Sequence, residues 1–174
     1  MIYEFEGIKP KLSRNTLVFP NAIIVGDVKI GEYTSIWPNA VIRGDLDSVK
    51  IGKYTHIQDN AVVHTDFDRP VEIGDYVTIA HNAVIHGCLI EDEVVVGIGA
   101  IVLDGAKVRS GSLIGAGALV GPKKEIPENS VVLGVPGKIV RKQTNEERKK
   151  MLNEITIRYS ELLKRYDPDF WRKR

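Results

Sequence analysis

The chain has 174 residues, 43% of them hydrophobic, and a formal net charge of +1. This length and apolar content suffice for one domain with a buried core, and the near-neutral charge gives no reason to expect a nucleic acid or an anionic membrane as partner. The single cysteine, Cys88, cannot form a disulfide within the chain, and no N-terminal apolar run resembles a signal peptide or a transmembrane span. We therefore expect a soluble, cytoplasmic protein whose basic end, Arg172, Lys173 and Arg174, is a solvated tail.

The dominant pattern is a period of six residues. Residues 1–16 alternate apolar and polar side chains at their start, which predicts a short strand or cap. After them come aliphatic anchors at Val18, Ile24, Ile30, Ile36, Ile42, Ile51, Ile57, Val63, Ile73, Ile79, Ile85, Ile90, Val96, Val102, Val108, Ile114, Val120, Ile126 and Val132. Such a period predicts a parallel β-helix, in which three hexapeptides close one triangular coil. A sandwich would instead show period-two alternation and hairpins spaced by about 8 to 12 residues.

The six-residue frame is interrupted in three places. Three extra residues follow Ile42, four follow Val63, and one residue is missing after Ile85. Insertions in solenoids usually bulge as loops at a corner. Residues 44–50 and 65–71 are therefore predicted to be loops, and both border a stretch rich in histidine.

A helix is expected after the repeat. Thr144, with Glu147 three positions later, has the pattern of a capping box, and apolar residues at nearly helical spacing follow as far as a stop at Pro168. We predict a β-helix domain with an N-terminal cap over residues 1–141 and a C-terminal helix and tail over residues 142–174. Because a helix of this length is marginal alone, it should pack on the coil or on a neighbouring subunit.

Two of the histidines fall one full coil apart on the frame. His64 and His86 each directly follow an anchor and are separated by three hexapeptides, so they should stack on one face. Adjacent coils lie about 4.8 Å apart, a distance at which two imidazoles can bind one metal at about 2.0–2.1 Å each. Arg43 follows an anchor one coil further back and should join the same column.

A third histidine, His81, lies at the corner of the preceding face, so one chain can hardly close a site with all three. If the three bind one metal, His81 must come from another subunit, and a three-fold trimer of parallel prisms would contain three such sites. A lone outward histidine is usually a surface group, and His56, which points outward at the end of its hexapeptide, is predicted to have no ligand role. Cys88 is interpreted as a small buried residue rather than a ligand.

At these residues the sequence resembles the γ-class carbonic anhydrase family. The resemblance extends from Val18 to the C-terminal helix and is most specific at residues 43–45, 58–59, 64 and 81–88. It implies an all-β solenoid, a left-handed parallel β-helix of hexapeptide repeats with a C-terminal α-helix, assembled as a homotrimer. It also implies that zinc, or iron or cobalt, binds His64 and His86 of one subunit and His81 of its neighbour.

The resemblance assigns roles to further residues. It implies that Gln58 orients the metal-bound water, that Arg43, Asp45 and Asp59 form ion pairs across the trimer interface, and that Arg43 also binds bicarbonate. Tyr159 would reach the metal pocket, as a helix tyrosine does in some shorter members. The implied reaction is that of a carbonate dehydratase, a lyase: metal-bound hydroxide reversibly hydrates carbon dioxide to bicarbonate, because three neutral imidazoles leave the metal its full charge and a place for water.

The sequence also departs from the family pattern. The archetypal members carry a glutamate directly after the Arg-x-Asp triplet and a second one in an acidic loop after the first histidine. Here Leu46 occupies the first position, and the short loop offers Asp66 and Asp68. His56 stands at a position where an asparagine is frequent in that family.

Two alternatives remain open at this point. Many β-helix proteins of this repeat are acyl-CoA-dependent acyltransferases, which use a histidine as general base and need no metal, and residues 134–138 resemble the segment that ends their coils. The second alternative is a metal-binding or assembly protein with little hydratase activity, since fold does not fix function. A requirement for metal separates the first from a carbonic anhydrase, and turnover with metal loaded separates the second.

Overall fold

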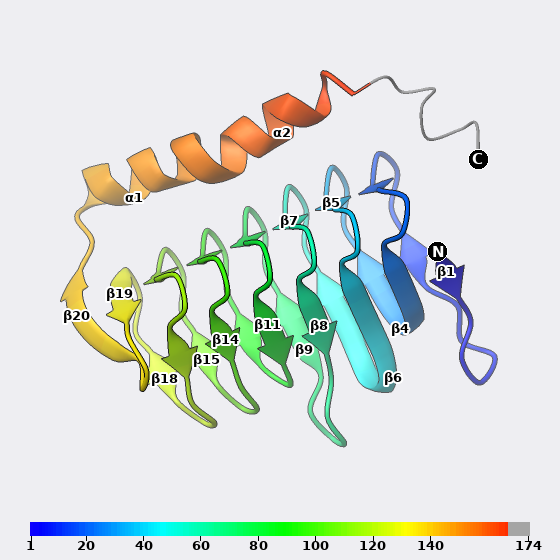
Figure 1. The fold of residues 1–174 in the computed structure, drawn as a ribbon, viewed down its shortest axis with the longest axis horizontal. Helices are drawn as coiled ribbons and strands as arrows, with labels where there is room; N and C mark the ends of the chain where they lie inside the picture. Colours follow the sequence, from blue (N-terminus) through cyan, green and yellow to red (C-terminus); the bar gives the residue numbers. More distant parts are fainter. Residues whose placement is uncertain (167–174) are drawn as a thin grey trace.

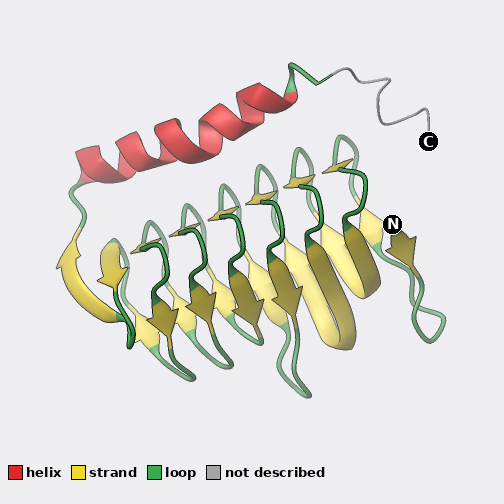
Figure 2. Cartoon of the chain, viewed as in Figure 1, coloured by secondary structure: helices red, strands yellow, loops and turns green. Residues whose placement is uncertain are grey.

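The computed structural model describes residues 1–166, which form a parallel β-helix of about seven coils with a helical segment along one side (Figure 1). Figure 2 shows the strands of the stacked coils in yellow, the turns between them in green and the helix in red. This architecture confirms the predicted left-handed β-helix of hexapeptide repeats. The division of the chain into domains at residue 141 stays a prediction, and Pro168 and the basic end, residues 172–174, lie outside the described residues.

The six-residue anchors build the core. From Ile24 to Val132 every anchor is at most 4% exposed. Parallel pairing places each anchor beside the anchor one coil on, as with Ile57 and Ile79. Since fully burying one such side chain contributes roughly 1.5–3 kcal/mol, the stacked anchors are the main source of stability.

One face of the coil carries the predicted histidine column, and we call it the histidine face. It comprises β8 (Val62–His64), β11 (Val84–His86), β14 (Ile101–Val102), β17 (Leu119–Val120) and the first parts of β4 (Ile23–Ile30) and β6 (Val41–Ile51). The residue before each anchor points outward and is aliphatic in every coil, giving a continuous column of Ile23, Val41, Val62, Val84, Ile101 and Leu119. These side chains are only half-buried in a single chain.

The second face, the charged face, comprises the later parts of β4 and β6 together with β2 (Lys11–Leu12), β9 (Val71–Ile73), β12 (Leu89–Ile90), β15 (Lys107–Val108) and β18 (Glu125–Ile126). Its outward column is mostly ionic and consists of Lys29, Lys50, Glu72, Leu89, Lys107 and Glu125. Such a column is suited to water. At the N-terminus, β1 (Ile2–Tyr3) pairs with β4 and caps the first coil, as predicted.

The third face, the helix face, comprises β3 (Leu17–Val18), β5 (Ser35–Ile36), β7 (His56–Ile57), β10 (Thr78–Ile79), β13 (Val95–Val96), β16 (Leu113–Ile114) and β19 (Ser130–Leu133). A turn after β19 leads into β20 (Lys138–Lys142), which pairs antiparallel with β19 and was not predicted. The helical segment then runs back over this face as α1 (Asn145–Met151), the π-helical η1 (Leu152–Ile157) and α2 (Arg158–Leu163). Its N-terminus has the predicted capping box of Thr144 and Glu147.

The contact between the helix and the coil is partly polar, although the sequence indicated an apolar stripe. His56 leaves the coil outward, as predicted, but the helix buries it completely. Its Nε2 lies 3.0 Å from the carbonyl oxygen of Thr156 and 3.1 Å from Oγ of Ser160, while Nδ1 lies 2.7 Å from Oγ of Ser35. His56 therefore joins the helix to the coil. Within residues 1–166, no helix is long and apolar enough to cross a bilayer.

The prediction of a loop over residues 44–50 is wrong. These residues continue β6 as one strand, which pairs with β4 across a register irregularity next to Gly26. Gly44 permits the close approach, because a Cβ atom there would lie 2.6 Å from the carbonyl oxygen of Asp27. Most of the second predicted loop is confirmed: residues 65–70 form a loop closed by a bridge between Asp66 and Arg69, and β9 begins at Val71.

The anchors give a direct stability prediction. Ile114→Ala should lower the free energy of unfolding by about 2–5 kcal/mol, because it leaves a cavity in a fully buried stack far from the histidines. Lys107→Ala, at an exposed position, should change it by less than about 0.5 kcal/mol. Urea denaturation of both variants checks this, and equal effects would contradict the core assignment.

His56 predicts a pH dependence of stability. Burial lowers the pKa of His56 from 6.5 to about 4, against a smaller opposing effect of the Thr156 carbonyl. As pH falls from 6.5 toward 4, the unfolded chain takes up a proton on this imidazole that the folded chain excludes. The contribution of neutral His56 to the free energy of unfolding is therefore complete above pH 6.5 and falls by about 3 kcal/mol as the pH decreases to about 4. Denaturation of wild type and His56→Asn across this window should give a flatter profile for the variant, and parallel profiles would refute the assignment.

Candidate metal centre

His64 and His86 stack as the repeat frame predicted. β8 and β11 pair in parallel with His86 opposite His64, and β6 places Arg43 opposite His64 on the other side. Nδ1 of His64 lies 3.2 Å from Nε2 of His86, and the ring centroids are 5.1 Å apart. The pair thus follows from repeat length alone, since a residue one coil later occupies the same position on the face.

Each of the three candidate histidines has one ring nitrogen beside a carboxylate. The pairs are His64 Nε2 with Asp45 Oδ1 at 3.1 Å, His86 Nδ1 with Asp104 Oδ1 at 2.6 Å, and His81 Nδ1 with Asp59 Oδ2 at 2.9 Å. An ionised carboxylate only accepts hydrogen bonds, so the rings of His64 and His86 donate their N–H to Asp45 and Asp104, and the opposite nitrogen of each ring carries the lone pair. The lone pairs of His64 and His86 therefore face one another.

The pair fits a divalent cation. Two nitrogens bound tetrahedrally at about 2.0–2.1 Å from one metal lie about 3.3 Å apart, close to the separation observed between His64 and His86. A ligating histidine commonly donates its other N–H to a carboxylate, which fixes the ring and its tautomer. The His64–His86 pair has both the nitrogen separation and the carboxylate partners of such a site.

The electrostatics keep the pair ready to ligate. Burial lowers the pKa of His64, and the charges of Arg43 and His86 lower it further, while Asp45 acts in the opposite direction. The net decrease favours the neutral imidazole. Burial raises the pKa of Asp45, but hydrogen bonds from Arg43 and His64 outweigh it and lower that pKa overall. Asp45 is therefore ionised and His64 neutral at physiological pH.

His81 belongs to a second cluster on the same chain. It lies in the turn after β10, beside Asp59, and its Nε2 is 3.4 Å from the hydroxyl of Tyr159 in α2. Burial, with the charge of Asp59, raises the pKa of Tyr159, so the phenol stays protonated. Over residues 1–166, no three His, Cys, Asp or Glu side chains of one chain are grouped to hold a metal. The structure thus brings together His64, His86, Arg43 and Asp45, and keeps His81, Asp59 and Tyr159 apart from them.

The remaining sequence candidates are placed as follows. Gln58 directly follows β7 and its anchor Ile57 and is 3% exposed, and its backbone N–H donates to the carbonyl oxygen of Ile79 in the next coil. Cys88 lies in the core, as predicted, and burial raises the pKa of its thiol to about 12, so the thiol stays protonated. Asp66 pairs with Arg69 in the exposed loop, and the side chain of Leu46 is exposed.

Asp104 is the residue that sequence reasoning missed. It stands two positions after the anchor Val102, one coil beyond His86, where it reads as an ordinary corner aspartate. The signal that would have identified it is the coil spacing, because residue 104 lies one coil after residue 86 and is therefore its neighbour in space.

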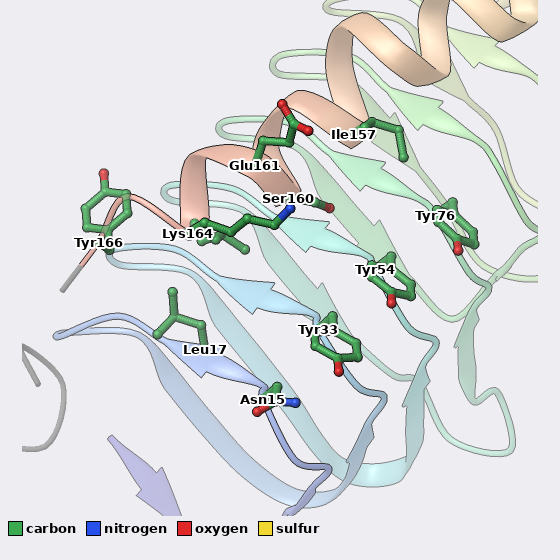
Figure 3. Close-up of a pocket in the computed structure, with 11 residues that line it drawn as sticks. Asn15, Leu17, Tyr33, Tyr54, Tyr76, Ile157, Ser160, Glu161, Lys164 and Tyr166 are labelled. Atoms are coloured by element: carbon green, nitrogen blue, oxygen red, sulfur yellow. The ribbon is translucent and has the colours of Figure 1, made fainter. Parts of the chain in front are cut away.

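A cavity of about 730 Å³ lies between the helical segment and one corner of the coil (Figure 3). Tyr33, Tyr54 and Tyr76 stack along that corner with ring centroids 5.0 Å apart, and Ser160 and Lys164 of the helical side also line the cavity. None of the candidate metal-ligating histidines is among its described lining residues. The cavity is therefore separate from both histidine clusters.

The family described as bacterial transferase hexapeptide (six repeats) matches residues 9–44. The chain is 54% identical over 151 residues to the probable carbonic anhydrase of Methanocaldococcus jannaschii, which covers 87% of this chain and 94% of that protein. It is 40% identical over 144 residues to the mitochondrial gamma carbonic anhydrase 2 of Arabidopsis thaliana, covering 79% of this chain and 52% of that protein.

Among solved structures, a putative acetyltransferase from Bacillus cereus superposes with a TM-score of 0.90 at 39% identity, covering 92% of this chain and 93% of that one. The fold is thus shared with a protein bearing a transferase name. The 54% identity over nearly the whole Methanocaldococcus jannaschii protein is the more extensive sequence match of those described. The chain belongs to the γ-class carbonic anhydrase family.

Proposed function

We propose that the protein is a metal-dependent carbonic anhydrase that reversibly hydrates carbon dioxide to bicarbonate at the interfaces of a homotrimer. The observation that carries this proposal is the His64–His86 pair, whose facing nitrogens lie 3.2 Å apart while carboxylates hold the opposite nitrogens. Similarity to proteins named carbonic anhydrase supports the same reaction.

The ligands would be His64 and His86 of one copy and His81 of the next. Zinc is the first choice of cation, with iron and cobalt as alternatives that imidazole also suits. When bound, the cation acts as a Lewis acid that makes hydroxide available near neutral pH for attack on carbon dioxide. The donor set is neutral, and its charged partners, among them Asp45 and Asp59, remain behind the rings.

The other site residues would bind and orient the reactants. Nη2 of Arg43 lies 3.4 Å from Nδ1 of His64, and the guanidinium forms an ion pair with Asp45. Its fixed positive charge can therefore hold bicarbonate beside the His64–His86 pair. The protonated Tyr159 hydroxyl can donate a hydrogen bond to water or bicarbonate next to His81. The amide of Gln58, at the corner between the helix face and the histidine face, would orient the attacking water.

The outer surface of the coil supports assembly. The helix covers one face and charged residues cover another, but the aliphatic column of the histidine face stays half-buried in one chain. A continuous apolar surface of this kind favours association. His81 stands at the edge of this face, so a second copy packed on it would bring its own His81 toward the pair. Three-fold closure then gives three equivalent sites.

Acyl transfer is the rival that the Bacillus cereus similarity brings forward. That reaction would use one histidine as a general base and would need no metal. The carboxylate-backed pair favours the metal instead, since two facing lone pairs repel unless a cation or a proton lies between them. Turnover that disappears with the metal and returns with it separates the two reactions.

A mixed-trimer experiment tests the shared site. His81→Ala and His64→Ala should each lose carbon dioxide hydration and bound metal on their own. Co-expressed in equal amounts, they should regain about a quarter of the wild-type turnover and metal per subunit, because about one interface in four then combines an intact pair with an intact His81. Stopped-flow hydration assays and metal analysis of the same sample measure both.

The matched control co-expresses His64→Ala with His86→Ala, which leaves no interface with an intact pair. No recovery is expected there. Recovery in neither mixture, from trimers that assemble normally, would contradict a site shared between copies.

The apolar column predicts where assembly can be broken. Val84→Asp should shift the protein from trimer toward monomer, because it places a charge within the packed aliphatic column. Leu89→Asp makes the same change at the matching frame position of the charged face and should leave the trimer intact. Light scattering coupled to gel filtration distinguishes them, and a trimeric Val84→Asp would argue against this interface.

A further inference from the structure

Asp104 makes the shortest of the three histidine–carboxylate contacts. Its side chain comes from the turn between β14 and β15, one coil beyond His86, and Oδ1 lies 2.6 Å from Nδ1 of His86. Both side chains are less than one-third exposed. The contact is thus a short, partly shielded and charge-assisted hydrogen bond.

The backbone leaves room for this contact at Gly87. Gly87 has φ +48°, and a Cβ atom there would lie 2.5 Å from Oδ1 of Asp104, so any other residue at this position would displace the carboxylate. The amide of Gly105 donates to the carbonyl oxygen of Gly87 at 2.7 Å and fixes the spacing of the two coils. The carboxylate therefore reaches His86 through a gap that glycine provides.

Aspartates at the same frame position elsewhere do something different. Asp75 and Asp92 also stand two residues after an anchor, but Oδ1 of Asp75 accepts the backbone N–H of Lys53 at 2.9 Å, and Oδ1 of Asp92 accepts that of Asp75 at 2.8 Å. Their task is to satisfy the backbone of the preceding coil. At Asp104 the same geometry is directed at an imidazole.

The consequence concerns the tautomer of His86. With the proton on Nδ1, donated to Asp104, the lone pair of Nε2 faces Nδ1 of His64. Without the carboxylate, the proton can move to Nε2 and form a hydrogen bond with Nδ1 of His64 across the 3.2 Å gap. The pair would then close on itself, and a cation would have to break that bond.

We propose that Asp104 is a positioning residue that holds His86 in the Nδ1–H tautomer and so keeps its Nε2 available to a metal. This inference rests on the proposed metal site and extends it by a residue outside the ligand set. Losing such a partner typically weakens metal binding about 10- to 100-fold.

The test measures metal affinity rather than turnover. Full-length apo-protein is titrated with Zn²⁺ against a competing chelator, and the visible spectrum of the Co²⁺ form reports the ligand arrangement. Asp104→Ala should bind Zn²⁺ about 10- to 100-fold more weakly with an altered Co²⁺ spectrum. Asp104→Asn should lose only about three- to tenfold, because its amide oxygen is a weaker acceptor that can still hold Nδ1–H. Asp92→Ala and Asp92→Asn should match wild type.

The outcomes separate the two levels of the proposal. Tight binding by wild type with equal affinity in the Asp104 and Asp92 variants would overturn the positioning role and leave the metal site standing. A wild type that binds neither ion would overturn both. If Asp104→Ala fails to fold, the difference between Asp104→Asn and Asp92→Asn decides.

Discussion

The structure depends on one constraint, the parallel register between successive coils. Buried anchors such as Ile42, Val63 and Ile85 stack directly on one another, so residues about 21 positions apart in sequence become neighbours in space. A slip of one residue would send each anchor outward, and the core resists that. The same register carries Arg43, His64 and His86 into one column. The site is therefore as well determined as the core that supports it.

The position just before each anchor gives the three faces their different surroundings. Under the helix it is filled by small or buried residues such as Ser35, His56 and Thr78, which accept a helix laid across them. On the charged face it is occupied mainly by lysine and glutamate, and on the histidine face by aliphatic residues throughout. Because each coil consists of three hexapeptides, the residues that face solvent and those proposed to meet a second copy lie on different faces.

The features that could be predicted from the sequence are those that depend only on a residue's position in the six-residue repeat. The stacking of His64 on His86, the corner position of His81 and the burial of Cys88 all follow from counting along the frame. The continuous strand through residues 44–50 could not be reached in this way, because the insertion is absorbed by pairing with β4 instead of looping out.

Two further features escaped because side chains, rather than backbone position, decide them. Asp104 becomes a partner of His86 only because Gly87 leaves space between the coils. His56 is buried because Thr156 and Ser160 of the helix supply hydrogen-bond partners that an apolar stripe does not suggest. The roles assigned to Gln58, Tyr159 and the metal stay predictions.

The central claim is that the paired imidazoles hold a catalytic cation. The most direct measurement is stopped-flow carbon dioxide hydration on anaerobically purified wild-type protein, with bound metal quantified on the same samples at several levels of loading. Bound metal should saturate at about one ion per subunit, and turnover should rise in proportion to occupancy. Full occupancy without turnover would contradict it and would leave a metal-bound assembly whose task lies elsewhere.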